Sequence, residues 1–116
     1  MKATVLSYAA TRGENMRPGF TRRIVHTPSL LTAILDIDNG PWDSPDPYHS
    51  HPHEQITYLA EGEILFLAEG QEPCRMIAGD LFAVPSGVPH SIQLLSKGAR
   101  LIDTFTPVRE DFLPTS

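Results

Sequence analysis

The sequence predicts an all-β fold, a sandwich or barrel built from short strands. Stretches rich in Val, Ile, Leu, Phe and Thr recur along the chain, and the 3.6-residue periodicity of amphipathic helices is almost absent. Eight glycines and 11 prolines separate these stretches. With 116 residues, of which 41% are hydrophobic and 20% charged, the chain has the size and composition of one globular domain.

We expect nine strands, with glycine-containing turns at 61–62, 69–70, 78–79 and 97–98. The strands are expected at residues 3–8, 20–26, 30–37, 54–60, 63–68, 74–78, 81–85, 90–95 and 99–106. Residues 39–47 hold three prolines, which lack the N–H that a central strand donates, so a loop over the mouth of a barrel is expected there. No internal repeat or linker divides the chain. One domain, 1–116, is expected, with the core of the barrel at about 20–108.

Charge and cysteine content narrow the classes of function. The formal net charge is -5 and no Lys/Arg cluster is present, which argues against nucleic acid because its binding depends on neutralising phosphates. No apolar run approaches the ~20 residues of a membrane helix. The polar stretch from Thr11 leaves no room for a secretory signal, so a cytoplasmic location is expected. The one cysteine, Cys74, cannot form an internal disulfide and is expected to be an inert thiol.

Histidines cluster directly before the strand expected at 54–60. Because alternate residues of an extended chain share a face, His49, His51, His53 and Gln55 are expected to point the same way. Neutral imidazole is the commonest metal ligand, so the pattern predicts a metal site, with surface histidines as the simpler alternative. Pro52 disturbs the strand, and we therefore expect His53 at the rim of the site.

A second segment, from Gly79 to His90, also ends on a histidine at the start of a strand. Together the two segments resemble the two motifs of the cupin family. The first motif, G-x5-H-x-H-x3-4-E-x6-G, maps onto His49, His51, Gln55 and Gly62, and the second, G-x5-P-x-G-x2-H-x3-N, maps onto Gly79, Pro85, Gly87 and His90. The resemblance implies a single-domain cupin, a double-stranded β-helix or jelly-roll barrel. It also implies that His49, His51, Gln55 and His90 bind one divalent metal ion.

The chain departs from the cupin motifs at three positions. Asp43 replaces the first Gly, Gln55 replaces the usual Glu, and Leu94 replaces the final Asn. Gln55 removes the one anionic ligand, so we expect a site that holds metal less tightly but acts as a stronger Lewis acid. This fits poorly with the three-His, one-Glu set of oxygen-activating cupins. Three imidazoles and an amide suit nickel, zinc, iron, cobalt or manganese, and the sequence does not choose among them.

The strand expected at 99–106 carries a third pattern. By alternation Asp103 and Phe105 share a face, so a carboxylate and an aromatic ring are expected in one cavity. From the residues alone, a solvated Asp beside an ordinary core Phe is the simpler alternative. The tail from Asp103 to Phe112 is similar to the D-x-F-x-P-x-R-E-D-F ending of the KdgF-type pectin-degradation cupins. The segment H-x-H-P-H-E-Q fits the same group, and the match spans most of residues 20–113.

This narrower resemblance implies a function. Members of the group are homodimeric, metal-dependent enzymes that convert cyclic 4,5-unsaturated uronate monosaccharides to the linear keto form. It implies catalytic roles for Asp103 and Phe105 and substrate binding by Arg109. An iron-dependent dioxygenase and a non-catalytic small-molecule-binding cupin are the alternatives.

The partners expected are a small acidic sugar and a second copy of the chain, with no nucleic acid and no membrane. The dimer has a basis in the residues themselves, because Ile56, Tyr58 and Ala60 lie on the face opposite Gln55. That apolar face would be exposed unless a partner covered it.

Overall fold

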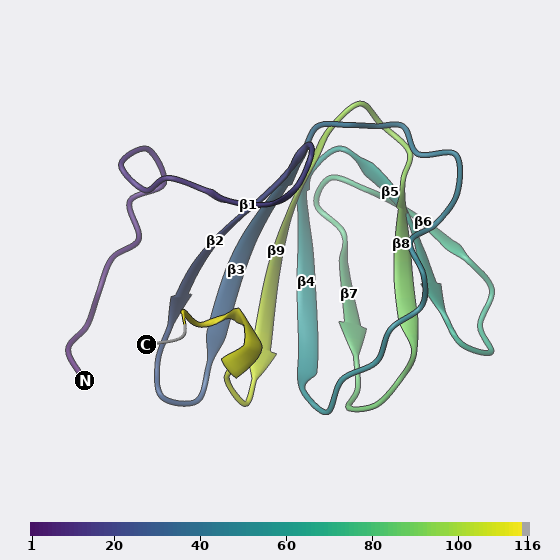
Figure 1. Ribbon diagram of the computed structural model, residues 1–116. Coiled ribbons are helices and arrows are strands. Elements are labelled where there is room, and N and C mark those ends of the chain that lie inside the picture. The colour runs from purple at the N-terminus through teal and green to yellow at the C-terminus, as the bar shows by residue number, and fades with distance from the viewer. Residues whose placement is uncertain (115–116) are drawn as a thin grey trace.

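The computed structural model describes residues 1–114, which form two antiparallel β-sheets facing one another (Figure 1). The larger sheet has six strands in the order β1-β2-β3-β9-β4-β7, and the smaller has three in the order β6-β5-β8. The strands are β1 (Glu14–Arg17), β2 (Phe20–His26), β3 (Leu31–Ile37), β4 (Glu54–Glu61), β5 (Glu63–Ala68), β6 (Cys74–Ile77), β7 (Leu81–Val84), β8 (His90–Leu94) and β9 (Ala99–Thr106). The all-β jelly-roll barrel expected from the sequence is confirmed.

Alternation along the strands determines which side chains face the interior. In β9 every second residue is buried, which confirms that Asp103 and Phe105 share the inner face. The register places Asp103 opposite Thr57 of β4 and Phe105 opposite Gln55. Four functional or polar side chains therefore lie in two adjacent rows on the concave side of the six-stranded sheet.

Apolar side chains from both sheets fill the end of the barrel that lies away from Gln55 and His90. Leu59 lies on β4, two residues after Thr57. Leu94 is the last residue of β8, and His90 is the first. These two leucines have no exposed surface, and burial of each side chain stabilises the fold by roughly 1.5–3 kcal/mol. The remaining buried members of this core are Ile37, Ile64, Met76, Phe82, Val84, Ala99 and Leu101. The packed end carries the stability, which leaves the histidine end free to be polar.

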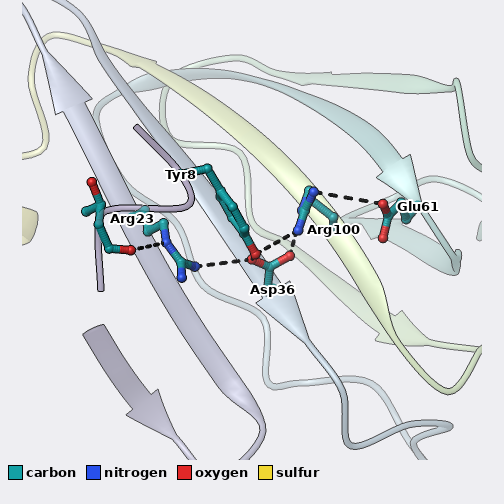
Figure 2. Close-up of polar contacts among 6 residues, drawn as sticks. Tyr8, Arg23, Asp36, Glu61 and Arg100 are labelled. Atoms are coloured by element: carbon teal, nitrogen blue, oxygen red, sulfur yellow. Dashed lines mark hydrogen bonds and ion pairs between the residues drawn. The ribbon is translucent and has the colours of Figure 1, made fainter. Parts of the chain in front are cut away.

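Both ends of the chain differ from the prediction. The strand expected at 3–8 is wrong, because the edge of β2 that it would need is paired with β1. Tyr8 instead holds this segment to the outer face of the large sheet through Arg23, Asp36 and Arg100 (Figure 2). After β9, a 3₁₀ helix that was not expected, η1 (Glu110–Phe112), lies against the inner side of the large sheet. Within residues 1–114 no helix is long and apolar enough to cross a membrane.

The proline-rich segment 38–50 was expected to lie over the barrel mouth, but its first part lies at the apolar end of the barrel, where Trp42 packs against the core. The segment crosses from β3 to the smaller sheet and then follows β8 (Figure 1), with the N–H of Trp42 donating to the carbonyl of Leu94 at 2.9 Å. Gly40 is required for this path, because a Cβ there would overlap the carbonyl oxygen of Ser96. The pairing continues along β8 and brings the first histidine of the cluster to the edge of that strand.

Candidate metal centre

Three histidines converge at the end of the barrel opposite the apolar core. One ligating atom from each of His49, His51 and His90 lies within 4.8 Å of the other two. His49 and His90 exchange two backbone hydrogen bonds, of 3.0 and 2.9 Å, so the loop and β8 place their rings together. The N–H of Gly87 donates to the carbonyl of His51 at 2.8 Å, from a turn in which Gly87 has φ +77°. A glycine of the second motif thus positions a histidine of the first.

Hydrogen bonds at Nδ1 define the tautomers of two of these rings. The Nδ1 of His51 lies 3.0 Å from the carbonyl of His53, and the Nδ1 of His90 lies 2.9 Å from the carbonyl of Val88. A carbonyl only accepts, so each Nδ1 carries a proton and each neutral ring has its lone pair at Nε2. The Nε2 of His90 is buried and has no hydrogen-bond partner among the described residues. A buried, unpartnered lone pair is what a metal ligand presents.

Gln55 contributes a fourth donor atom to this cluster. Its Oε1 lies 3.0 Å from the Nε2 of His51, and its side chain is buried. When the ring of His51 is neutral with its proton at Nδ1, two lone pairs face each other, which is unfavourable unless a cation lies near both. Three imidazoles and one amide oxygen are therefore compatible with a divalent transition metal, and they do not select one.

The surroundings of His49 and His90 favour the neutral form of both rings. Burial lowers the pKa of His90, although its hydrogen bond to the backbone of Val88 acts in the opposite direction. Burial also lowers the pKa of His49, and the neighbouring His90 and His51 lower it further. The neutral imidazole is the form that binds metal. Both side chains are therefore ready to bind an ion at neutral pH.

Asp103 lies beside this cluster on the inner face of β9. The residue is 7% exposed, and its carboxylate accepts a 2.6 Å hydrogen bond from the hydroxyl of Thr57. Burial raises the pKa of Asp103 to about 6, while the hydrogen bond from Thr57 and the charge of Arg109 act to lower it. The simpler alternative of a solvated Asp is wrong. A carboxyl group with this pKa exchanges protons readily near neutral pH.

Arg109 reaches the same region from the segment after β9. Its guanidinium carbon lies 5.0 Å from the ring centre of Phe105 and 4.2 Å from that of Phe112, distances typical of cation–π contacts. The ring of Phe112 also faces the buried guanidinium of Arg22 at 4.0 Å. Two nitrogens of Arg109 donate to the carboxylate of Asp111, at 2.9 and 2.6 Å. A ligand carboxylate would therefore compete with Asp111 for Arg109.

A cavity of about 290 Å³ joins these groups, which is near the lower end of the range for small-molecule sites. The polar and aromatic side chains that line it include His49, Gln55, His90, Asp103, Phe105 and Arg109. Seven of the side chains that the sequence singled out, counting His51 beside the cavity, are thus brought to one place. The arrangement can bind a small anionic molecule next to a metal and exchange a proton with it.

Comparison with known proteins supports the same classification. The family model described as a cupin domain matches residues 35–105. This chain is a cupin. It is 31% identical over 105 residues to the pectin degradation protein KdgF of Dickeya dadantii, and the match covers 89% of this chain and 92% of that protein. The family expected from the two motifs is confirmed.

Solved structures give the same result for the fold. The structure of KdgF from Halomonas sp. matches this cupin with a TM-score of 0.85 and 30% identity, covering 95% of this chain and 100% of that one. An RmlC-like cupin from Shewanella frigidimarina matches with a TM-score of 0.84 and 31% identity, covering 97% of each chain. The resemblance to the KdgF-type cupins, which rested on the tail and the histidine segment, is confirmed.

His53 lies beside the metal ligands, as the expected rim position implies, whereas the places of Thr57 and Phe112 were not predicted. In this cupin His53 is half-buried beside the cluster, with its ring centre 5.6 Å from that of His51, and its nitrogens are not among the converging ligand atoms. Thr57 joins the site, and alternation from Gln55 along β4 was the signal that would have found it. Phe112 ends the tail motif, but strand alternation did not predict its place, because the position of η1 depends on packing against the large sheet.

Proposed function

We propose that this cupin is a metal-dependent enzyme that converts cyclic 4,5-unsaturated uronate monosaccharides to the linear keto form. The observation that carries the proposal is a buried Asp103 in the same small cavity as the three-histidine cluster. The similarity to the pectin degradation protein KdgF over 89% of the chain supports the substrate class. Arg109 supplies the positive group that an acidic sugar requires in a protein of net charge -5.

Opening the ring requires one proton to be removed and another to be delivered. The anomeric hydroxyl loses its proton as the bond between the anomeric carbon and the ring oxygen breaks. The bond's electrons go to the ring oxygen, which becomes an enolate, and carbon 4 gains a proton as the enolate becomes a ketone, so the reaction is an isomerisation with no net gain or loss of atoms. Asp103, with a pKa of about 6, accepts the first proton and returns one. A divalent ion bound by His49, His51, Gln55 and His90 would supply Lewis acidity at a sugar oxygen.

Two further side chains bind and orient the sugar in this proposal. Arg109 pairs with the uronate carboxylate after exchanging it for Asp111, its present partner. Phe105 packs on the apolar face of the sugar ring and separates Asp103 from bulk water. Arg109→Lys keeps the charge but loses the two-pronged contact. We expect it to raise KM by about tenfold while changing kcat less, measured by steady-state kinetics.

The direct test is an assay with 4,5-unsaturated galacturonate as substrate. The metal-loaded protein is expected to remove the ultraviolet absorbance of the conjugated double bond, and NMR is expected to show the linear keto product. Oxygen consumption by the iron-loaded protein would instead identify a dioxygenase. Binding of the sugar without turnover would leave the non-catalytic cupin, so either result would defeat the proposal.

We also propose that the protein acts as a homodimer in the cytoplasm. The outer face of the six-stranded sheet exposes Ile56 (54%), Tyr58 (40%) and Leu81 (61%), and a groove runs between Ile56, Ala83 and Thr104. A second copy on this face would remove that apolar surface from water. Sedimentation at micromolar concentration is expected to give twice the chain mass, and Ile56→Asp is expected to give the monomer. A monomeric wild type contradicts the dimer, and cell fractionation tests the location.

A further inference from the structure

A short chain of hydrogen bonds joins the candidate metal centre to Asp103. The Nε2 of Gln55 donates to the Oγ1 of Thr57 at 2.9 Å, and the hydroxyl of Thr57 donates to the Oδ1 of Asp103 at 2.6 Å. All three residues are buried, and Thr57 has no exposed surface at all. The remaining polar atom of the amide, Oε1, faces His51. One hydroxyl group therefore stands between a proposed metal ligand and a proposed catalytic carboxylate.

The direction of these hydrogen bonds follows from the donors and acceptors available. The amide nitrogen of Gln55 has no lone pair to offer, so Thr57 can only accept from it. The single proton of Thr57 must then go to another acceptor, and Asp103 is the one within reach in residues 1–114. Hydrogen bonds in the reverse direction would need Oε1 of Gln55 turned toward Thr57, which would direct the amide nitrogen toward His51. The orientation of the amide is thus coupled to the bond between Thr57 and Asp103.

We propose that Thr57 is a positioning residue that turns the carbonyl oxygen of Gln55 toward the histidines and makes glutamine, rather than glutamate, the residue required at position 55. A glutamate would place a carboxylate oxygen against the Oγ1 of Thr57, whose proton is already donated to Asp103. Two acceptors would then face each other in a buried site, which is costly. The inference deepens the proposed function and rests on its metal site. It also gives a physical reason for the departure from the cupin motif at this position.

The first test compares two substitutions of Thr57 in the full chain after metal has been removed with a chelator. Thr57→Val keeps the shape and removes the hydroxyl, whereas Thr57→Ser keeps the hydroxyl. Affinity for Ni²⁺, measured by competition with a chromogenic chelator, is expected to fall by about 10–100-fold in the first variant and to stay near the wild-type value in the second. Equal affinity in wild type and Thr57→Val overturns the proposal, as does a Thr57→Ser variant as weak as Thr57→Val.

The second test is a double-mutant cycle read by thermal unfolding of the metal-free protein. Gln55→Glu is expected to lower the unfolding temperature strongly on its own, and much less together with Asp103→Asn. The amide introduced at 103 can donate to Thr57, which frees the proton of Thr57 for a carboxylate at 55. Additive effects of the two substitutions overturn the proposal.

Neither test uses the sugar, so the two proposals fail separately. A wild type that binds Ni²⁺ and shows the expected cycle, but does not turn over the uronate, defeats only the enzymatic proposal. An additive cycle in an active enzyme defeats only the role of Thr57. A wild type that does not bind Ni²⁺ overturns the role of Thr57 together with the metal site on which it rests.

Discussion

Two aspartates on neighbouring strands of the large sheet lie on opposite faces and have very different surroundings. On the outer face, Asp36 of β3 accepts hydrogen bonds from the hydroxyl of Tyr8 at 2.6 Å and from the Nε of Arg100 at 2.7 Å, and Arg23 approaches to 3.5 Å (Figure 2). The ring of Tyr8 lies between the two guanidinium groups, at 4.0 and 4.5 Å. Every charge in this outer cluster has an opposite charge or a hydroxyl beside it.

On the inner face, Asp103 of β9 receives one hydrogen bond, from Thr57, and no ion pair forms with it among the described residues. Burial therefore dominates, and the pKa of Asp103 is raised to about 6. The outer cluster pairs its charges and holds the N-terminal segment in place. On the inner face, the carboxylate of Asp103 and the Nε2 of His90 are incompletely paired. This is costly for folding and useful for binding and proton transfer. The comparison predicts that substitutions on the two faces have separate consequences.

The largest effect is expected from removing two metal ligands at once. A variant with His51→Ala and His90→Ala should lose its bound metal and keep its fold, because the apolar core lies at the other end of the barrel. Elemental analysis measures the metal, and circular dichroism measures the fold. Asp36→Asn on the outer face is the matched control and should retain a full complement of metal. Metal retained by the double variant would contradict the site.

Replacing the inner aspartate should nearly abolish turnover. Asp103→Asn keeps the shape and the acceptor for Thr57 but cannot take up a proton, so turnover of the unsaturated uronate should fall by roughly 10²–10⁴-fold with metal content unchanged. Asp36→Asn should turn the sugar over at the wild-type rate. Equal turnover by the Asp103→Asn variant and the wild type would show that the two aspartates do not differ in function.

The raised pKa of Asp103 predicts a pH dependence of stability in the metal-free protein. The folded protein holds the proton of this carboxyl up to a pH of about 6, whereas the unfolded chain releases it near the ordinary pKa of an aspartate, 3.8. The contribution of Asp103 is therefore fully present below that lower value and is lost as the pH rises through about 6, with a size of about 3 kcal/mol. Urea unfolding across this range should show the decline in the wild type. The Asp103→Asn variant should lack it, and a parallel decline in both proteins would refute the assignment.

The smallest effect is expected on the outer face. Tyr8→Phe removes the hydroxyl that Asp36 and Arg100 share, and should lower the free energy of unfolding by about 0.5–1.5 kcal/mol. Metal content and turnover should not change, because Tyr8 lies on the other side of the sheet from the cavity. A loss of activity without loss of stability would mean that the two clusters are coupled.

Much of the site was predictable because strand periodicity is local. The alternation that put Asp103 and Phe105 on one face follows from the backbone of any β-strand, and so does the inward direction of Gln55. The spacing of His49, His51 and His90 against two cupin motifs indicated that a loop and a distant strand meet. Eight of the nine expected strands have counterparts in the structure because turns at glycines interrupt the apolar stretches locally.

The remaining features depend on contacts between parts of the chain that are far apart in sequence. Residues 3–8 alternate like a strand, but a strand needs a free edge and β1 occupies the one on β2. The bond between Arg109 and Asp111 and the place of Phe112 depend on how η1 packs against the large sheet.

The sequence by itself determined which residues alternate inward and which motifs they form, because these properties follow from local backbone geometry. Only the tertiary structure decided that Thr57 lies between Gln55 and Asp103, because register between strands arises from packing of the whole sheet. Only burial within the assembled barrel raises the pKa of one aspartate and leaves the Nε2 of His90 without a partner. The chemistry of the site therefore depends on the fold as much as on the motifs.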